Sequence, residues 1–448
     1  MTFRISSRLS GFVLGSLCVF VGSLPMAAFA AEQPEYEDWN AKFQATYVWQ
    51  RKDSFSAAYS DAHSLSQDRE KSYSFTATAS LGIRPWVGGE LYFNPEAAQG
   101  VPLSGLTGLA GFTNGEMART SGPMLKLYRA RLFLRQTWDQ GGEREAVASE
   151  ANQLAGSVAR QRMVLTVGNL SVLDIFDNNE YNHDPRTQFL NWALMTHGSY
   201  DYAADARGYS WGAALEWYHD DWAFRIGRFA QPKEPNMLAL DPDIFRHYGD
   251  QIEVEHAHEI NGQPGKLRFL AFHNRTKMSR YQDALNFAAI NGGTPDINQV
   301  RYGEQSKVGF GINLEQALSN DVGMFARASL ADGKTETYAF TEIDRSISGG
   351  ILVKGGSWGR GMDKVGLGIA RNGLSRAHRD YLASGGMGFF LGDGKLNYRP
   401  ETIFETFYSW SVARSSQLSF DWQYIQNPAY NADRGPVNMF AVRLHSEF

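Results

Sequence analysis

The stretch SYSFTATASLGI, residues 72–83, decides the fold of this 448-residue chain. Its apolar side chains occupy every second position, and serine, threonine or glycine lies between them. A period of two is typical of a β-strand whose two faces meet different surroundings. The same alternation recurs along the chain, for example in residues 208–217, 307–315 and 417–424.

A soluble β-sandwich also alternates, so the surroundings of the two faces need further observations. The segments are about ten residues long, which is enough for a tilted strand to cross a bilayer. Aromatic residues collect near the segment ends, and the chain ends on an alternating strand with Phe448. No stretch after residue 31 approaches the ~20 apolar residues of a spanning helix. We therefore predict an all-β fold, a transmembrane antiparallel up-and-down β-barrel.

The links between the alternating segments differ systematically in length. Short and long links alternate along the chain, as expected for short periplasmic turns and long extracellular loops. The link from Gln140 to Arg160 should be short by its place in this alternation, but it is long. The pattern predicts about 16 strands, starting near residues 42, 72, 89, 125, 161, 208, 221, 249, 265, 307, 322, 338, 363, 401, 416 and 437.

The first 30 residues have the pattern of a secretory signal peptide. Positive charge comes first, a short apolar stretch follows, and small residues precede a cleavage site before Ala31. We expect residues 1–30 to be the signal peptide and residues 31–448 to be the barrel. The one cysteine, Cys18, lies in the signal, which excludes disulfides and thiolate sites from the mature chain. The net charge of −5 argues against a nucleic-acid partner.

About 16 strands enclose a water-filled channel, so we expect the chemistry on the inward strand face. Alternation places three arginines of residues 129–135 on one face of a single strand. A lumen with both signs of charge rejects neither type of ion strongly, and its polar groups can exchange with sugar hydroxyls. A salt-bridged wall without selectivity fits the same pattern. The predicted pore-lining residues are Arg129, Arg131, Arg135, Glu216, Arg225, Glu342 and Glu405.

The segment from Leu170 to Arg207 is the best candidate for an inward constriction loop. Its carboxylates and amides suit sugar hydroxyls, and its rings suit the apolar face of a sugar. The residues assigned to the constriction are Asp174, Phe176, Asp177, Glu180, Tyr181, Asp184 and Arg186. A second interpretation is a site for a hard divalent cation such as Mn²⁺ or Ca²⁺, held by Asp174, Asp177, Glu180, His183 and Asp184. A loop folded by Asx turns and internal ion pairs is the third.

Several long blocks of sequence resemble the OprB-type carbohydrate-selective porin family. They are LYFNPE (91–96), the segment 174–194 ending in DPRTQFLNWAL, FRHYGDQ (245–251), AHRDYL (377–382), GDGKLNYRPE (392–401) and NPAYNADRGP (427–436). The resemblance covers almost all of the mature chain. It implies a sixteen-stranded outer-membrane channel with a charged constriction that admits glucose and related sugars. Some close relatives, of a manganese-porin type, are assigned to Mn²⁺ uptake. The pore residues named above come from alternation and are not carried over from the family.

These observations predict a bacterial outer-membrane porin for passive diffusion of glucose-type monosaccharides. Divalent-cation (Mn²⁺) permeation is the alternative within the same fold. An outer-membrane hydrolase would need a site such as His183 with Asp184, and we expect no enzyme. No cofactor is expected beyond a bound Ca²⁺ or Mn²⁺. The expected partners are small sugars or divalent cations, outer-membrane lipid and the assembly machinery, which would read Phe448; a homotrimer is left open.

Overall fold

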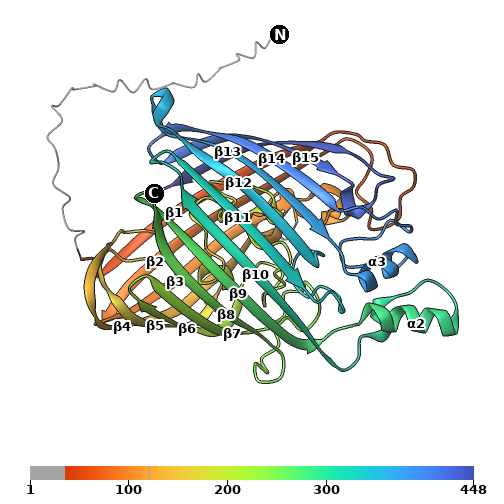
Figure 1. The fold of residues 1–448 in the computed structure, drawn as a ribbon, viewed down its shortest axis with the longest axis horizontal. Coiled ribbons are helices and arrows are strands. Elements are labelled where there is room, and N and C mark those ends of the chain that lie inside the picture. The colour runs from red at the N-terminus through yellow and green to blue at the C-terminus, as the bar shows by residue number, and fades with distance from the viewer. Residues whose placement is uncertain (1–35, 121) are drawn as a thin grey trace, which may run out of the picture. The chain divides into compact units, whose positions relative to one another are not determined.

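The computed structural model describes residues 36–120 and 122–448, and the predicted signal peptide lies outside the described residues. The described chain forms a closed antiparallel barrel in which every strand pairs with its sequence neighbours and β1 pairs with β16 (Figure 1). The predicted fold and strand number are confirmed. The strands are β1 (Trp39–Lys52), β2 (Glu70–Trp86), β3 (Gly89–Val101), β4 (Lys126–Val147), β5 (Gly156–Leu170), β6 (Ser210–His219), β7 (Trp222–Ala230), β8 (Tyr248–Ile260), β9 (Gln263–Lys277), β10 (Glu304–Ala317), β11 (Val322–Ala331), β12 (Arg345–Gly355), β13 (Arg360–Gly373), β14 (Glu401–Ala413), β15 (Ser416–Gln426) and β16 (Val437–Glu447).

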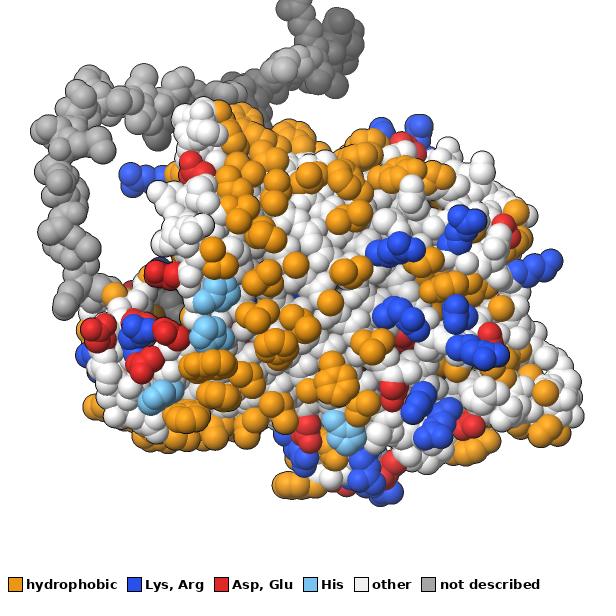
Figure 2. Space-filling model, in the orientation of Figure 1, with side chains coloured by type: hydrophobic (Ala, Val, Ile, Leu, Met, Phe, Trp, Pro, Cys, Tyr) orange, Lys and Arg blue, Asp and Glu red, His pale blue; other side chains and the backbone are white. Residues whose placement is uncertain are grey.

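The two faces of the wall follow the alternation of the sequence. In β2, Ser74 and Thr76 are buried inside the barrel, whereas Leu81 and Ile83 are 39% and 48% exposed on its outer surface. Figure 2 shows apolar side chains spread over the outside of the wall. A closed barrel satisfies the backbone hydrogen bonds of every strand, so the apolar outer face can meet lipid without unpaired edges. Among the described residues, no helix has the length and apolar character needed to cross a membrane.

The two ends of the barrel differ. Adjacent strands are joined at one end by short turns such as residues 87–88, 220–221, 261–262 and 414–415, and at the other end by long loops. The helices α2 (Tyr281–Asn291) and α3 (Arg376–Ala383) lie at the loop end, away from the C-terminus, in Figure 1. Short turns face the periplasm and long loops face outward in barrels of this class. We call the two ends the turn end and the loop end.

The hairpin of β4 and β5 accounts for the long link predicted between Gln140 and Arg160. Both strands continue past the neighbouring turns, and only residues 148–155 connect them. This connection folds back over the lumen, where the Asn152 amide donates to Ser80 Oγ at 3.0 Å and Arg135 donates to the Asn152 carbonyl at 2.9 Å. The segment therefore covers part of the lumen at the turn end.

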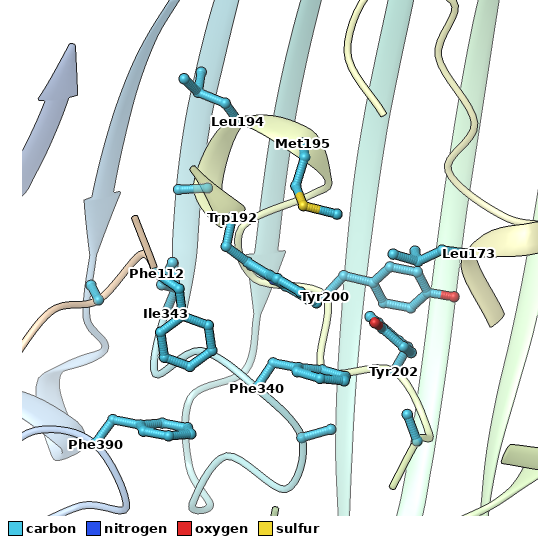
Figure 3. Packing of buried hydrophobic residues seen from close by; sticks show 14 of the residues in the cluster. Phe112, Leu173, Trp192, Leu194, Met195, Tyr200, Tyr202, Phe340, Ile343 and Phe390 are labelled. Atoms are coloured by element: carbon cyan, nitrogen blue, oxygen red, sulfur yellow. The ribbon is translucent and has the colours of Figure 1, made fainter. Parts of the chain in front are cut away.

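Three loops fill much of the lumen with apolar packing. They are L2 (residues 102–125), L3 (residues 171–209, including α1, Trp192–Met195) and L6 (residues 332–344). Figure 3 shows rings from all three loops close together around Trp192. The Trp192 and Phe340 ring centroids are 4.6 Å apart, and Phe189 contacts Phe407 of the wall at 5.1 Å. The barrel thus has a core of its own inside the wall, and the open passage is what these loops leave.

The largest error in a predicted strand start concerns β12. The twelfth strand was expected near residue 338 but begins at Arg345. Residues 338–344 alternate in sequence, yet the Tyr338 and Ala339 amides donate to the Asp201 carboxylate of L3, at 3.0 and 2.7 Å. Phe340 has a φ of 58°, which ends the extended backbone. A tertiary contact therefore takes the place of strand pairing here.

Candidate functional site

Buried glutamates of the wall hold L3 inside the barrel. Glu405 of β14 accepts hydrogen bonds from the Leu190 and Asn191 amides at 2.6 and 3.0 Å. Glu253 of β8 accepts from the Asp177 amide at 2.8 Å, and Glu315 of β10 accepts from the Glu180 amide at 2.8 Å. A carboxylate that accepts backbone N–H groups satisfies donors that the loop could not pair by itself. These acids position the constriction.

A bidentate ion pair joins L3 to β4 at the passage. Arg131 donates through Nε and Nη2 to the two carboxylate oxygens of Asp174, at 2.7 and 2.6 Å. The side chains are 12% and 26% exposed, so both remain accessible from the passage. Burial alone would raise the pKa of Asp174, but the guanidinium of Arg131 outweighs it and holds the pKa below its ordinary value. Asp174 is therefore charged at neutral pH.

Two further arginines stand in front of two buried carboxylates. Arg186 of L3 contacts Glu116 of L2 at 3.0 Å and Glu96 of β3 at 3.2 Å. Arg119 of L2 contacts the same Glu116 at 2.7 Å. The arginine side chains are 16% and 19% exposed, whereas Glu96 and Glu116 are 0% and 1% exposed. The surface offered to the passage is consequently cationic, although each charge has a partner behind it.

The arginines line a cavity of about 410 Å³ that also has an aromatic side. Trp192, Tyr202 and Phe340 line it together with Arg119, Arg131 and Arg186. Pockets for small organic molecules commonly measure about 300–1,000 Å³ and combine apolar surface with a few polar groups. Lys42, His445 and Glu447 line the same cavity from the first and last strands. The arrangement can offer donors to hydroxyl oxygens and a flat apolar face to a ring.

The structure brings five of the predicted residues together in this cavity, namely Arg131, Asp174, His183, Asp184 and Arg186. Arg129 was predicted to line the pore and does not. It is exposed on the outer wall with its guanidinium 5.0 Å from the ring of Trp211. The pairing of β3 with β4 shifts between Asn94–Arg131 and Pro95–Arg129, which leaves Ala130 as an extra residue. This β-bulge reverses the phase of alternation, and Pro95, which has no N–H to pair, lies opposite it.

The other predicted wall residues have different roles. Arg135 and Glu216 face a separate cleft at the turn end, and Arg225 is neutralised by Glu216, Glu253 and Glu255 at 3.1, 2.8 and 3.2 Å. Glu405 does not line the pore, because L3 covers it. Glu342 lies in L6 instead of a strand and accepts from backbone amides of residues 389–391. Both predictions missed that a loop folds over an inward carboxylate.

The remaining residues assigned to the constriction do not share the cavity. Phe176 is fully buried against the wall. Asp177 is fully buried and bound by Arg327 Nε at 2.9 Å and by the His197 amide at 2.7 Å. Glu180 and Tyr181 line a different cleft of about 840 Å³ at the turn end. Of the seven residues assigned to the constriction, Asp174, Asp184 and Arg186 are the ones that line the cavity.

Of the predicted metal ligands, Asp174, His183 and Asp184 line the same cavity but do not converge on one point. Asp174 is held by Arg131 and Asp177 by Arg327, and the Asp184 carboxylate accepts from the Arg186 amide at 3.0 Å. Within the described residues, no three histidine, cysteine, aspartate or glutamate side chains form a group suited to a metal ion. The Mn²⁺ interpretation has no support from this geometry.

Sequence reasoning missed Arg119, Glu96 and Glu116. Glu96 directly follows Pro95, a residue that disfavours regular strand pairing, yet β3 continues through the bulge to Val101. Arg119 and Glu116 lie in L2, which was treated as an external loop. The apolar run Leu103, Leu106, Leu109 and Phe112 was the available signal, because such a run is costly in an exposed loop.

Comparisons with known proteins agree with this architecture. A family model described as "Carbohydrate-selective porin, OprB family" matches residues 67–448. The high-pH structure of Pseudomonas putida OprB is 15% identical with a TM-score of 0.70, over 92% of this chain and 94% of that chain. The outer membrane channel DcaP of Acinetobacter baumannii is 8% identical with a TM-score of 0.52, over 92% and 97% of the two chains. None of the curated proteins matches the sequence.

Proposed function

Because the chain belongs to the carbohydrate-selective porin family OprB, we propose that Arg119, Arg131 and Arg186 bind sugars as they cross its constriction. The protein is an outer-membrane porin for the diffusion of carbohydrates, a channel rather than an enzyme. The observation that carries the proposal is the cavity in which three arginines lie with an aromatic surface formed by Trp192, Tyr202 and Phe340.

The chemistry of the cavity suits a neutral polyol. A guanidinium has five N–H donors and no acceptor, so it can donate to hydroxyl oxygens while remaining bound to its own carboxylate. The C–H faces of a sugar ring are apolar and pack on aromatic rings. Because the arginines already have acid partners, a sugar can exchange with water at the remaining donors without leaving a bare charge. We infer a preference for compact, glucose-type monosaccharides over longer chains.

The test compares Arg119→Gln/Arg186→Gln with Arg129→Gln. Glutamine removes the cationic donors of the constriction in the double variant, and we expect the affinity for glucose, measured as current block in planar bilayers, to fall roughly tenfold. Arg129 lies on the same strand as Arg131 but outside the barrel, so glucose should block the current of Arg129→Gln as it blocks that of wild type.

The second readout is the swelling rate, in glucose and in maltose, of liposomes that contain either variant. A wild-type glucose block in Arg119→Gln/Arg186→Gln would show that these arginines do not bind the sugar. A Mn²⁺ flux measured in parallel decides whether the channel also passes divalent cations.

Two features of the chain ends belong to the same proposal. We infer that residues 1–30 direct export and are removed, and that Phe448 is read during barrel assembly. Phe448 closes the seam, because its amide and carbonyl pair with the carbonyl and amide of Phe43 at 2.8 and 2.9 Å. Loss of outer-membrane insertion on deletion of Phe448, with export intact, is the expected result.

A further inference from the structure

Basic side chains gather on the outside of the wall near the loop end. They lie near the strand ends, where they alternate with inward-facing residues and point away from the lumen. Figure 2 shows Lys and Arg concentrated on this part of the face. Acids nearby pair with three members of the set: Asp250 with Arg228 at 2.7 Å, Glu304 with Arg275 at 2.5 Å and Asp53 with Arg51 at 3.3 Å. The basic set is Arg51, Lys71, Arg129, Arg228, Arg275, Lys277, Arg345 and Arg371.

The turn end of the same outer surface has a different composition. Six exposed tryptophans lie near its turns: Trp39, Trp86, Trp138, Trp217, Trp222 and Trp410. Tryptophan suits the boundary between hydrocarbon and headgroups at either membrane face. Exposed cations also occur at the turn end, where Arg144 and Arg360 pair with Asp139 and Asp363. The basic set at the loop end lies at the outward-facing interface.

Arg345 and Arg371 form the most specific part of this surface. They lie on the adjacent strands β12 and β13, where Arg345 pairs with Gly373 and Ile347 pairs with Arg371. Such diagonal neighbours on one sheet face are about 7–8 Å apart, within reach of long side chains. Both are exposed, and among the described residues neither has a carboxylate at ion-pair distance, unlike Arg228 and Arg275.

Aliphatic side chains lie directly beside the two arginines on the lipid-facing side. Leu330 pairs with Arg345 across β11 and β12, and Leu330, Ile347 and Ile369 are 53%, 61% and 52% exposed. An unpaired guanidinium next to hydrocarbon is costly unless an anion meets it there. Solutes in the lumen cannot supply that anion, because the wall separates them from these side chains.

We propose that Arg345 and Arg371 together bind a phosphate group of the glycolipid in the outer leaflet, with Leu330, Ile347 and Ile369 against its acyl chains. A guanidinium binds phosphate through paired N–H donors, and two of them can clamp one group. The lipid is favoured over free phosphate because the arginines and the apolar surface are adjacent. This inference rests on the outer-membrane location and is independent of the sugar site.

The experiment measures lipid A binding to the full-length porin in detergent by native mass spectrometry. Wild type, Arg345→Gln/Arg371→Gln and Arg414→Gln are each titrated with bisphosphorylated lipid A and with the same lipid after phosphatase treatment. Arg414 is a matched control, since it is an exposed arginine in a turn at the opposite end. We expect the double variant to lose affinity for the phosphorylated lipid by roughly tenfold or more. Arg414→Gln should bind like wild type.

Glucose block in bilayers should be the same in all three proteins, which checks that the double variant is folded. Equal lipid affinity in wild type and the double variant overturns the proposal, as does equal binding of the dephosphorylated lipid by wild type. If inorganic phosphate binds as tightly as the lipid, the aliphatic surface contributes nothing and the site is not a lipid site. A changed oligomer mass with unchanged lipid affinity would instead make this wall a contact between copies.

Discussion

At the scale of single residues, the passage depends on which charges are covered. Glu96 and Glu116 carry negative charge at the constriction, but Arg119 and Arg186 cover both carboxylates. Burial alone would raise the pKa of Glu116, and the two guanidiniums outweigh that effect and lower it. Counting the charged residues in the lumen would therefore give the wrong charge for the surface that a solute contacts. Exposure, more than composition, decides the sign of the surface.

His197 gives L3 a dependence on pH. It is 1% exposed, and burial lowers its pKa to about 4 although Asp177 lies 3.4 Å away and opposes the shift. Between the ordinary pKa of about 6.5 and about 4, an undocked L3 takes up a proton before the docked loop does. The docked state should therefore lose stability as pH falls through this window, by roughly 3 kcal/mol in all.

Amide hydrogen exchange of peptides from L3 measures this effect, after correction for intrinsic rates. Protection of residues 190–200 should decrease between pH 7 and pH 4.5, and His197→Asn should remove the pH dependence. Residues 278–303 contain no histidine and serve as an internal control. Constant protection of L3 in wild type across the window would contradict the prediction.

At the scale of elements, sequence alternation predicted the wall and failed where the chain leaves regular pairing. Strands β3, β11, β14, β15 and β16 begin at the predicted residues because their sequence period matches an uninterrupted ladder. Arg129 was misplaced because the bulge at Ala130 is a property of two paired strands, and one strand's sequence does not reveal it. Glu405 was correctly placed inward, but its role depends on Leu190 and Asn191, over 200 residues away.

The anchoring of L3 to β14 should control the width of the passage. Glu405→Ala leaves two buried amides without an acceptor, which costs about 1–3 kcal/mol for each. We expect L3 to fluctuate and the single-channel conductance to rise and become noisy in planar bilayers. Glu342→Ala is the matched control, because it removes a similar clamp from residues 389–391, which do not line the cavity. Equal conductance in Glu405→Ala and wild type would mean that other contacts suffice to fix the loop.

At the scale of the whole molecule, the net charge and the passage have opposite signs. The chain carries −5 overall, whereas basic residues outnumber acidic ones around the constriction cavity. Its lining includes Lys42, Arg119, Arg131, Arg186 and Arg207 against Glu150, Asp174, Asp184 and Glu447. A narrow channel responds to its local field, so we expect a preference for anions over cations. Reversal potentials in a KCl gradient measure it, and the preference should weaken at high salt because the charges are screened. Arg119→Gln/Arg186→Gln should shift the reversal potential toward cations; a cation-selective wild type would contradict the assignment.

The division of labour between wall and loops has a consequence for how such channels can diversify. The number of strands fixes the circumference of the barrel, yet the width of the open passage depends on how much of the lumen L2, L3 and L6 occupy. The wall supplies Arg131 and the acceptors for loop amides, while Arg119, Arg186 and the aromatic surface lie on loops that can be replaced. Two barrels with the same wall can therefore differ in channel diameter and in the solute that they admit. Grafting L2 and L3 as a pair is the way to exchange one constriction for another.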